Sequence, residues 1–133
     1  MQHQPADTKL ALAAVDAALD KKGLEPVLLD VSGEASYTDH ILILSARSDR
    51  HAQAIADGIR TELRNQFGRS PKSVEGKRDG QWTLLDYGDL IVHVFYHPLR
   101  EFYDLESLWS EARTVELKVP AESRYRAHDA YAM

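Results

Sequence analysis

The segment from Gln81 to Tyr96 constrains the fold more than any other part of the sequence. It reads QWTLLDYGDLIVHVFY, in which apolar residues alternate on both sides of Tyr87-Gly88. Alternation with a period of two is typical of β-strands, and glycine supplies the positive φ that tight hairpin turns require. The segment therefore predicts two antiparallel strands joined by a two-residue turn at Tyr87-Gly88.

The two faces of this hairpin differ in chemistry. The face expected to pack in the core holds Thr83, Leu85, Leu90, Val92, Val94 and Tyr96. The other face holds Trp82, Leu84, Asp86, Asp89, Ile91, His93 and Phe95. With this turn Asp86 faces Asp89, and two like charges are unfavourable there unless a basic group approaches. The second face is either another core layer under a helix or a binding face for a basic protein, and the charge pair favours binding.

Apolar spacing in the rest of the chain predicts an α/β (α+β) fold with a mixed sheet of about five strands flanked by helices. Helices are expected over about 7–22, 49–67 and 99–111, and further strands over about 26–31, 41–44 and 72–75. Ser48 or Asp49 can begin the second helix and Gly68 can end it. Phe102 and Trp109 are expected in the core.

Length and charge limit the domain organisation and the class of partner. The chain has 133 residues, no cysteine and a net charge of −5. We expect a flexible segment over 1–6, one domain over 7–113 and a mobile tail over 114–133. The acidic balance argues against binding DNA or RNA phosphates and suits a basic protein. No apolar run approaches the roughly 20 residues that span a bilayer, and no signal peptide precedes the domain, so a cytoplasmic location is expected.

Catalytic and metal sites are poorly supported by the residue pattern. His93 and His97 on one strand lie about 13 Å apart, too far to share a zinc ion. Asp86 and Asp89 resemble the carboxylates of a two-metal transferase, but no glycine-rich phosphate-binding motif accompanies them. The sequence therefore predicts no enzymatic activity, cofactor or metal, and a divergent metal-dependent nucleotidyltransferase remains an alternative.

Four segments, in order and with natural spacing between 29 and 109, closely resemble the ribosomal silencing factor family, also called Iojap-like. They are Tyr37–Ser45, Ser48–Ala56, Val74–Gly76 with Trp82–Asp89, and His93–Phe95 with Arg100–Trp109. In the first segment His40 stands where the family commonly has tyrosine. Together the four segments are specific, whereas any one of them alone is weak.

The resemblance implies a nucleotidyltransferase-like topology without the transferase active site, and a homodimer when the protein is free. It further implies binding to ribosomal protein fourteen of the large ribosomal subunit. Occupying that surface blocks joining of the two subunits and represses translation under nutrient limitation. A factor for assembly of the large subunit is the alternative within the same resemblance.

The partner-binding residues are expected on the hairpin and the segment that follows it. They are Glu75, Lys77, Trp82, Leu84, Asp86, Tyr87, Asp89, His93, Arg100, Tyr103, Asp104 and Glu106. Aromatic side chains are expected to anchor the contact, and carboxylates to meet Lys and Arg of the ribosomal protein. Arg100 can alternatively form an ion pair with Asp104 or Glu101. In the tail, a minor contact with ribosomal RNA is possible for Arg124, Tyr125, Arg126 and His128.

Overall fold

The computed structural model describes residues 6–124 of the chain. Its helices are α1 (Lys9–Asp20), α2 (Asp49–Phe67) and α3 (His97–Tyr103), and its 3₁₀ helices are η1 (Leu105–Trp109) and η2 (Ala121–Ser123). Its strands are β1 (Leu24–Asp30), β2 (His40–Ala46), β3 (Ser73–Lys77), β4 (Trp82–Asp86), β5 (Leu90–Tyr96) and β6 (Arg113–Val115). Within this range no helix is both long and apolar enough to cross a lipid bilayer.

The strands form one mixed sheet in the order β3-β4-β5-β2-β1-β6. β2 and β5 pair in parallel at its centre, and the other neighbours are antiparallel. Every residue of β2 is buried, as a continuous aliphatic run predicts. The predicted mixed sheet is confirmed, with a sixth strand that the sequence did not indicate. Because β6 pairs with β1, the sheet extends past the domain boundary expected at residue 113.

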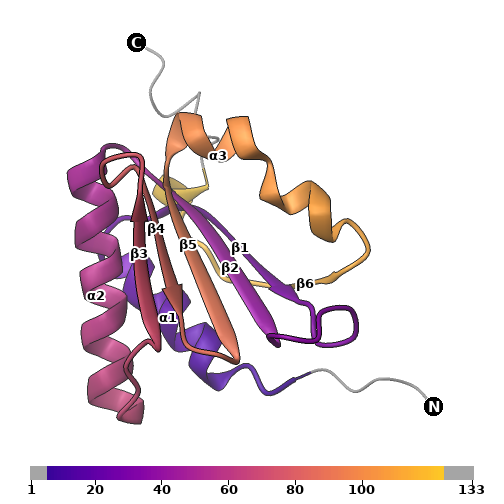
Figure 1. The fold of residues 1–133 in the computed structure, drawn as a ribbon. Helices are drawn as coiled ribbons and strands as arrows, with labels where there is room; N and C mark the ends of the chain where they lie inside the picture. The colour runs from indigo at the N-terminus through magenta and orange to yellow at the C-terminus, as the bar shows by residue number, and fades with distance from the viewer. Residues whose placement is uncertain (1–5, 125–133) are drawn as a thin grey trace.

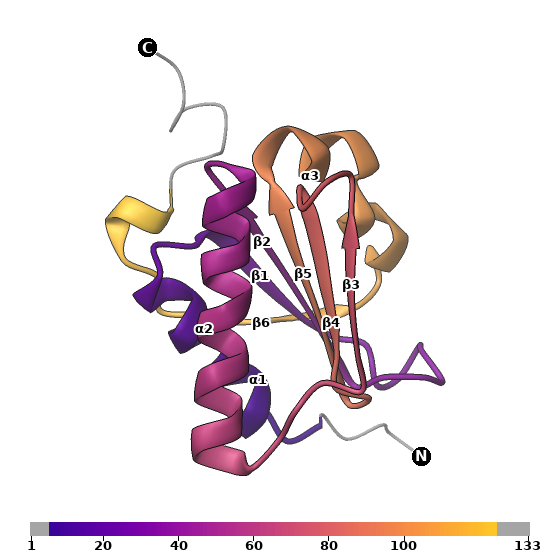
Figure 2. The same cartoon turned by 60° about the vertical axis from the view of Figure 1, so that its left-hand side comes forward.

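Helices cover the two faces of the sheet unequally (Figures 1 and 2). α1 and α2 lie together on one face, whereas α3 and η1 lie on the opposite face. α2 begins and ends as predicted: the Ser48 side chain accepts a hydrogen bond from the His51 N–H at 3.0 Å, and Gly68 ends the helix at φ 66°. Its buried residues include Ile55, Ile59 and Leu63.

The α3–η1 segment covers its face with one side only. Leu99, Tyr103, Leu105 and Trp109 pack on the buried cluster that contains Ile43 and Phe95. Asp104, at φ 45°, separates α3 from η1 and redirects the chain. Phe102 is 74% exposed, so its predicted place in the core is wrong. Trp109 is half-buried against the cluster.

The β4–β5 hairpin turns one residue later than predicted. Leu84 pairs with His93 rather than Ile91, and Trp82 pairs with Phe95 rather than His93. Gly88, at φ 90°, now takes the first central position of the turn. Moving the turn by one residue changes each cross-strand partner by two positions, so every side chain within β4 and β5 keeps its predicted face.

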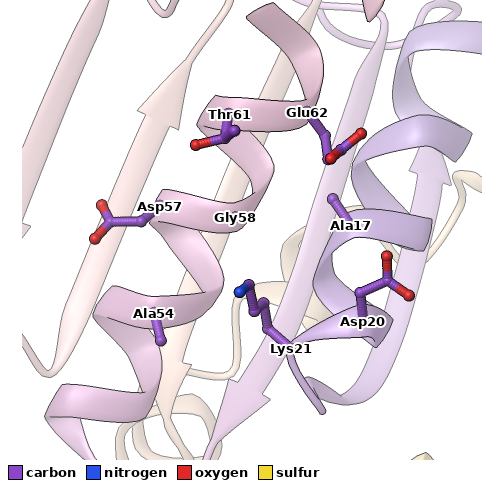
Figure 3. Close-up of a pocket in the computed structure, with 8 residues that line it drawn as sticks. All are labelled: Ala17, Asp20, Lys21, Ala54, Asp57, Gly58, Thr61 and Glu62. Carbon is purple, nitrogen blue, oxygen red and sulfur yellow. The ribbon is translucent and has the colours of Figure 1, made fainter. Parts of the chain in front are cut away.

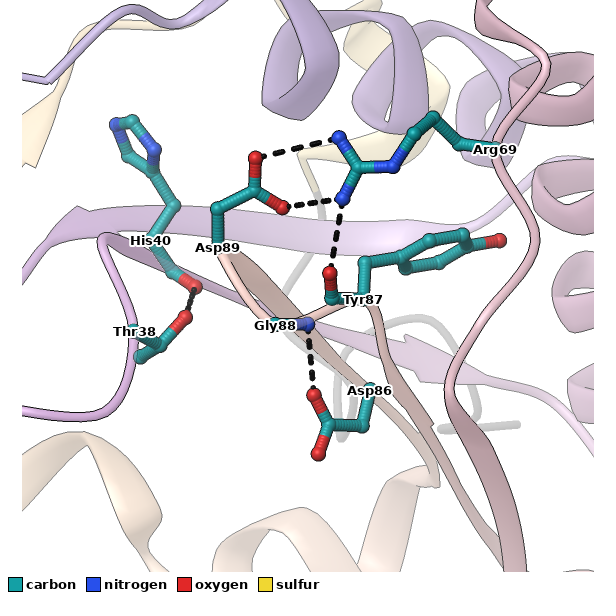
Figure 4. Close-up of polar contacts among 7 residues, drawn as sticks. All are labelled: Thr38, His40, Arg69, Asp86, Tyr87, Gly88 and Asp89. Atoms are coloured by element: carbon teal, nitrogen blue, oxygen red, sulfur yellow. Dashed lines mark hydrogen bonds and ion pairs between the residues drawn. The ribbon is translucent and has the colours of Figure 1, made fainter.

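The expected pair of opposed carboxylates is therefore absent from the hairpin. Asp86 lies opposite Ile91, and Asp89 lies within the turn. The Asp86 carboxylate accepts a hydrogen bond from the Gly88 N–H at 2.8 Å, which favours the shifted turn (Figure 4). The like-charge argument for a binding face was thus based on a wrong register, although the division into two faces is confirmed.

Candidate protein-binding face

One part of the sheet surface has no helix over it. It faces the same side as α3 and η1, but these segments pack on the cluster of β1, β2 and Phe95 rather than on β3. The open sheet face consists of Glu75 and Lys77 from β3, Trp82, Leu84 and Asp86 from β4, and Ile91 and His93 from β5. All of these residues are half-buried or exposed, whereas alternate residues of β4 and β5 that face α2 are buried.

Cross-strand pairing sets the neighbours on this face. Leu84 on β4 lies between Glu75 on β3 and His93 on β5. Asp86 lies beside Ile91 in the same way. The result is a row of apolar side chains bordered by carboxylates, the mixture that suits the edge of a protein interface with a basic partner.

Trp82 is the most constrained side chain of the open sheet face. Its indole N–H donates to His93 Nδ1 at 3.2 Å, and its ring lies 4.8 Å from Phe95 and 4.9 Å from Tyr103 between centroids. The Lys77 ammonium lies 5.0 Å above the same ring. These contacts hold the indole in one orientation, so little side-chain entropy remains to be lost when a partner binds.

His93 is neutral at physiological pH. Burial, together with the smaller effect of the positive charge of Lys77, lowers its pKa to about 4. Because Nδ1 accepts the indole hydrogen bond, the imidazole proton sits on Nε2. The centre of the open sheet face is therefore uncharged, and its charges lie at the periphery.

Asp89 is held inside the protein's own network. Its carboxylate accepts hydrogen bonds from the Arg69 guanidinium at 2.7 and 3.3 Å (Figure 4). The same guanidinium donates to the Tyr87 carbonyl at 2.9 Å. Arg69 thus fixes the hairpin turn to the segment after α2. Asp89 is expected from the sequence to bind a cation of the partner protein. In the structure its carboxylate already binds Arg69 of the same chain.

Two residues expected at a contact surface lie inside the protein. Tyr87 is 2% exposed and packs in the core with α1 and α2, where burial raises the pKa of its phenol. Arg100 is 7% exposed and donates to Ser45 Oγ, to the Glu25 carbonyl and to Glu106. Its ion-pair partner is therefore Glu106, at 2.9 Å, rather than Asp104 or Glu101. Both side chains build the fold and do not reach a surface.

The remaining expected residues adjoin the open sheet face. Tyr103 is half-buried beside Trp82, and its hydroxyl accepts hydrogen bonds from Arg78 at 2.7 and 3.1 Å. Asp104 is exposed where η1 begins. Sequence reasoning missed Arg78, which lies in a turn with no motif, and placed Ile91 on this face without selecting it. Arg124 contacts the Val119 carbonyl, while Tyr125, Arg126 and His128 lie outside the described residues.

Residues 6–124 contain no group of three or more His, Asp or Glu side chains placed to hold a metal ion. His97 begins α3, so the strand spacing assumed for His93 and His97 does not apply.

A hollow of about 460 Å³ lies between α1 and α2, away from the open sheet face (Figure 3). The stem of Lys21 lies against Gly58 there, and Asp57 points away from α1.

Comparison with known proteins identifies the relatives of this chain. Residues 3–132 match the model of the family described as "Ribosomal silencing factor during starvation". A ribosomal silencing factor from Halalkalibacterium halodurans is 38% identical over 113 residues, which cover 85% of this chain and 96% of that protein. The mouse protein named for mitochondrial assembly of the ribosomal large subunit is 32% identical over 85 residues, which cover 62% of this chain and 37% of that protein.

A solved structure supports the same relationship. A crystal structure of a protein from Chromobacterium violaceum superposes with a TM-score of 0.74 at 30% sequence identity. The superposition covers 86% of this chain and 93% of the other. The family model spans almost the whole sequence, and the relatives share both sequence and fold. The chain belongs to the ribosomal silencing factor family.

Proposed function

We propose that the chain binds ribosomal protein fourteen of the large ribosomal subunit through its open sheet face and thereby blocks joining of the small subunit. Translation is then repressed when nutrients are limiting. Membership of the ribosomal silencing factor family supports the ribosome as target. The observation that carries the choice of surface is the half-buried pair Leu84 and Ile91 on the open sheet face, which carboxylates border and beside which Trp82 is held by Tyr103 of α3.

The mechanism requires no chemical step by this chain. A rigid domain on the joining surface excludes the second subunit by its volume, and occupancy follows affinity, with about 1.4 kcal/mol for each tenfold change. The contacts of Trp82 with His93, Phe95 and Tyr103 supply the rigidity. In the free state the chain is proposed to be a homodimer, as the family resemblance implies.

Subunit joining followed by light scattering tests this function. The parent protein is expected to migrate with purified large subunits on a gradient and to reduce the joined particle. Leu84→Arg introduces a cation in the centre of the open sheet face and is expected to abolish both effects. The matched control is Phe67→Arg, because Phe67 is 39% exposed at the end of α2, on the other side of the sheet. Equal inhibition by Leu84→Arg and the parent excludes this face.

Assembly of the large subunit is a second candidate function. It is favoured by the similarity to the mouse protein whose name assigns it to mitochondrial large-subunit assembly. An assembly factor is expected to bind immature subunits in preference to mature ones and to leave joining of mature subunits unchanged. Gradient sedimentation with both kinds of particle separates the two candidates.

The nucleotidyltransferase alternative has lost its structural argument. Asp86 lies opposite Ile91, and Asp89 is bound by Arg69, so the two carboxylates do not converge on a metal position. Isothermal calorimetry with ATP and Mg²⁺ checks this directly. A saturable heat of binding supports the transferase, whereas its absence together with inhibition of joining supports the silencing factor.

A further inference from the structure

An exposed apolar patch lies on η1 and on the loop that touches it. Leu108 is 71% exposed, and Tyr37 is 60% exposed in the loop between β1 and β2. The Tyr37 ring meets the edge of the Trp109 ring, with 6.4 Å between centroids. We call Tyr37, Leu108 and Trp109 the η1 patch. Trp109 packs on the buried core cluster, while Leu108 precedes it in η1 and Tyr37 contacts its ring. Exposed apolar side chains that lie close together mark interaction sites.

The chain around the η1 patch is acidic. Between positions 97 and 111 the acidic residues are Glu101, Asp104, Glu106 and Glu111. Arg100 is the single Lys or Arg in this range, and it is buried against Glu106. The loop over 31–39 adds Glu34 and Asp39 and has no Lys or Arg. Within these two segments only Glu106 has a Lys or Arg partner, and the next Lys or Arg along the chain is Arg113.

The η1 patch and the open sheet face lie on the same side of the sheet, with buried residues of β2 between them. Ile91, at the border of the open sheet face, pairs with Ile41 on β2. Ile41 belongs to the buried cluster on which Trp109 packs. A partner that contacts both surfaces must therefore pass over the α3–η1 segment, because every residue of β2 is buried.

We propose that the η1 patch is a second docking surface, which takes a Lys/Arg-rich segment of a protein on the large ribosomal subunit. This inference rests on the proposed function. It gives the chain two contacts with the large subunit, one through the open sheet face and one through the η1 patch. A second copy of the chain would set acidic residues against acidic residues, and ribosomal RNA phosphates would meet the same repulsion. A basic protein segment satisfies both the apolar side chains and the charge around them.

Binding to purified large ribosomal subunits at several salt concentrations tests the proposal. Leu108→Ser is expected to weaken binding about tenfold, because it removes an apolar contact without adding charge. Glu111→Lys is expected to weaken binding and to make it less sensitive to salt, because one attractive charge becomes repulsive. Leu12→Ser is the matched control, since Leu12 is exposed on α1, on the other side of the sheet. Thermal unfolding is measured for all variants.

The outcomes separate this inference from the proposed function. If Leu108→Ser and Glu111→Lys bind like the parent while Leu84→Arg does not bind, the second docking surface is overturned and the proposed function stands. If the parent itself does not bind large subunits, both fail. The basic-protein occupant is overturned if Leu108→Ser converts a dimer to a monomer with unchanged subunit affinity. It is also overturned if Leu108→Ser loses binding to protein-free ribosomal RNA.

Discussion

The two faces of the sheet show how one set of strands can meet different requirements. On the α1–α2 side, alternate residues of β4 and β5 are buried in the core that these helices form with the sheet. On the opposite side, α3 and η1 cover β1, β2 and Phe95 but leave β3 and much of β4 open. Both faces contribute buried clusters to the fold, but only the second leaves part of its strands uncovered by a helix, and this uncovered part is the proposed binding surface.

The difference lies in which interactions fix the side chains. Apolar packing alone holds Ile59 and Leu63 on the closed face. On the open face, Trp82 is held by an indole–imidazole hydrogen bond, by ring contacts and by Lys77. Polar contacts of this kind keep a half-exposed aromatic in place without burying it, which leaves its surface available to a partner.

The largest expected effect is a loss of stability from a substitution in the core on the α1–α2 side. Leu63→Ala removes a fully buried side chain and is expected to lower the free energy of unfolding by about 2–5 kcal/mol, through lost burial and the cavity that remains. Urea denaturation measures this. Phe67→Ala, one turn later on the exposed side of α2, serves as control and is expected to cost under about 1 kcal/mol. Similar losses from both variants contradict the assignment of the core.

The next effect concerns pH and His93. Its pKa is about 4 in the folded protein and about 6.5 when unfolded, so the unfolded state binds more protons between these values. The contribution of neutral His93 to the free energy of unfolding is therefore complete above pH 6.5. It is lost as the pH falls toward 4, by about 3 kcal/mol at most.

Denaturation curves of the parent and His93→Gln across this pH range isolate the contribution of the imidazole. The parent is expected to lose more stability than the variant on acidification. NMR titration of the His93 ring measures the pKa directly. A value near 6.5 refutes the burial of His93 and its acceptor role toward Trp82.

Substitutions on the open sheet face are expected to change affinity for the large ribosomal subunit. Trp82→Ala is expected to weaken binding to the large subunit by at least about 2 kcal/mol if Trp82 is a central anchor. Because the indole also stacks on Phe95, part of the change appears as lost stability. Leu84→Ala removes less packing and is the cleaner probe. Unchanged affinity of both folded variants contradicts a role for this face in binding.

The smallest effect is expected at the hairpin turn. Asp89→Asn removes the ion pair with Arg69, but both side chains are exposed, so the loss of stability is expected to stay under about 1 kcal/mol. Thermal unfolding at low and high salt measures it. The difference between parent and variant should shrink at high salt. A loss of several kcal/mol contradicts the view that this contact merely orients the turn.

Local signals predicted the elements well. Ser48 and Gly68 located both ends of α2, and alternation along β4 and β5 assigned each side chain to its correct face. These features depend on neighbours in the sequence. β6 escaped prediction because a three-residue edge strand has no periodicity of its own and exists through pairing with β1.

Predictions that depended on distant partners failed. Arg100 is buried because the Glu25 carbonyl and the Ser45 hydroxyl, 75 and 55 residues away, converge on its guanidinium. The turn position also escaped prediction, since Arg69 binds both Asp89 and the Tyr87 carbonyl from another segment. For the candidate site, the composition of the face was therefore predictable, but its exact membership required the tertiary structure.

The parallel pair at the centre of the sheet has a consequence for how quickly the molecule can form. β2 and β5 are neighbours, yet residues 47–89 lie between them, and β1 meets β6 only at Arg113–Val115. Closing such long loops must precede the gain from pairing, which places a chain of this kind among slower-folding domains. A nascent chain that ends before Leu90 has no partner for the middle of its sheet. The open sheet face can therefore form only after β5 has been synthesised.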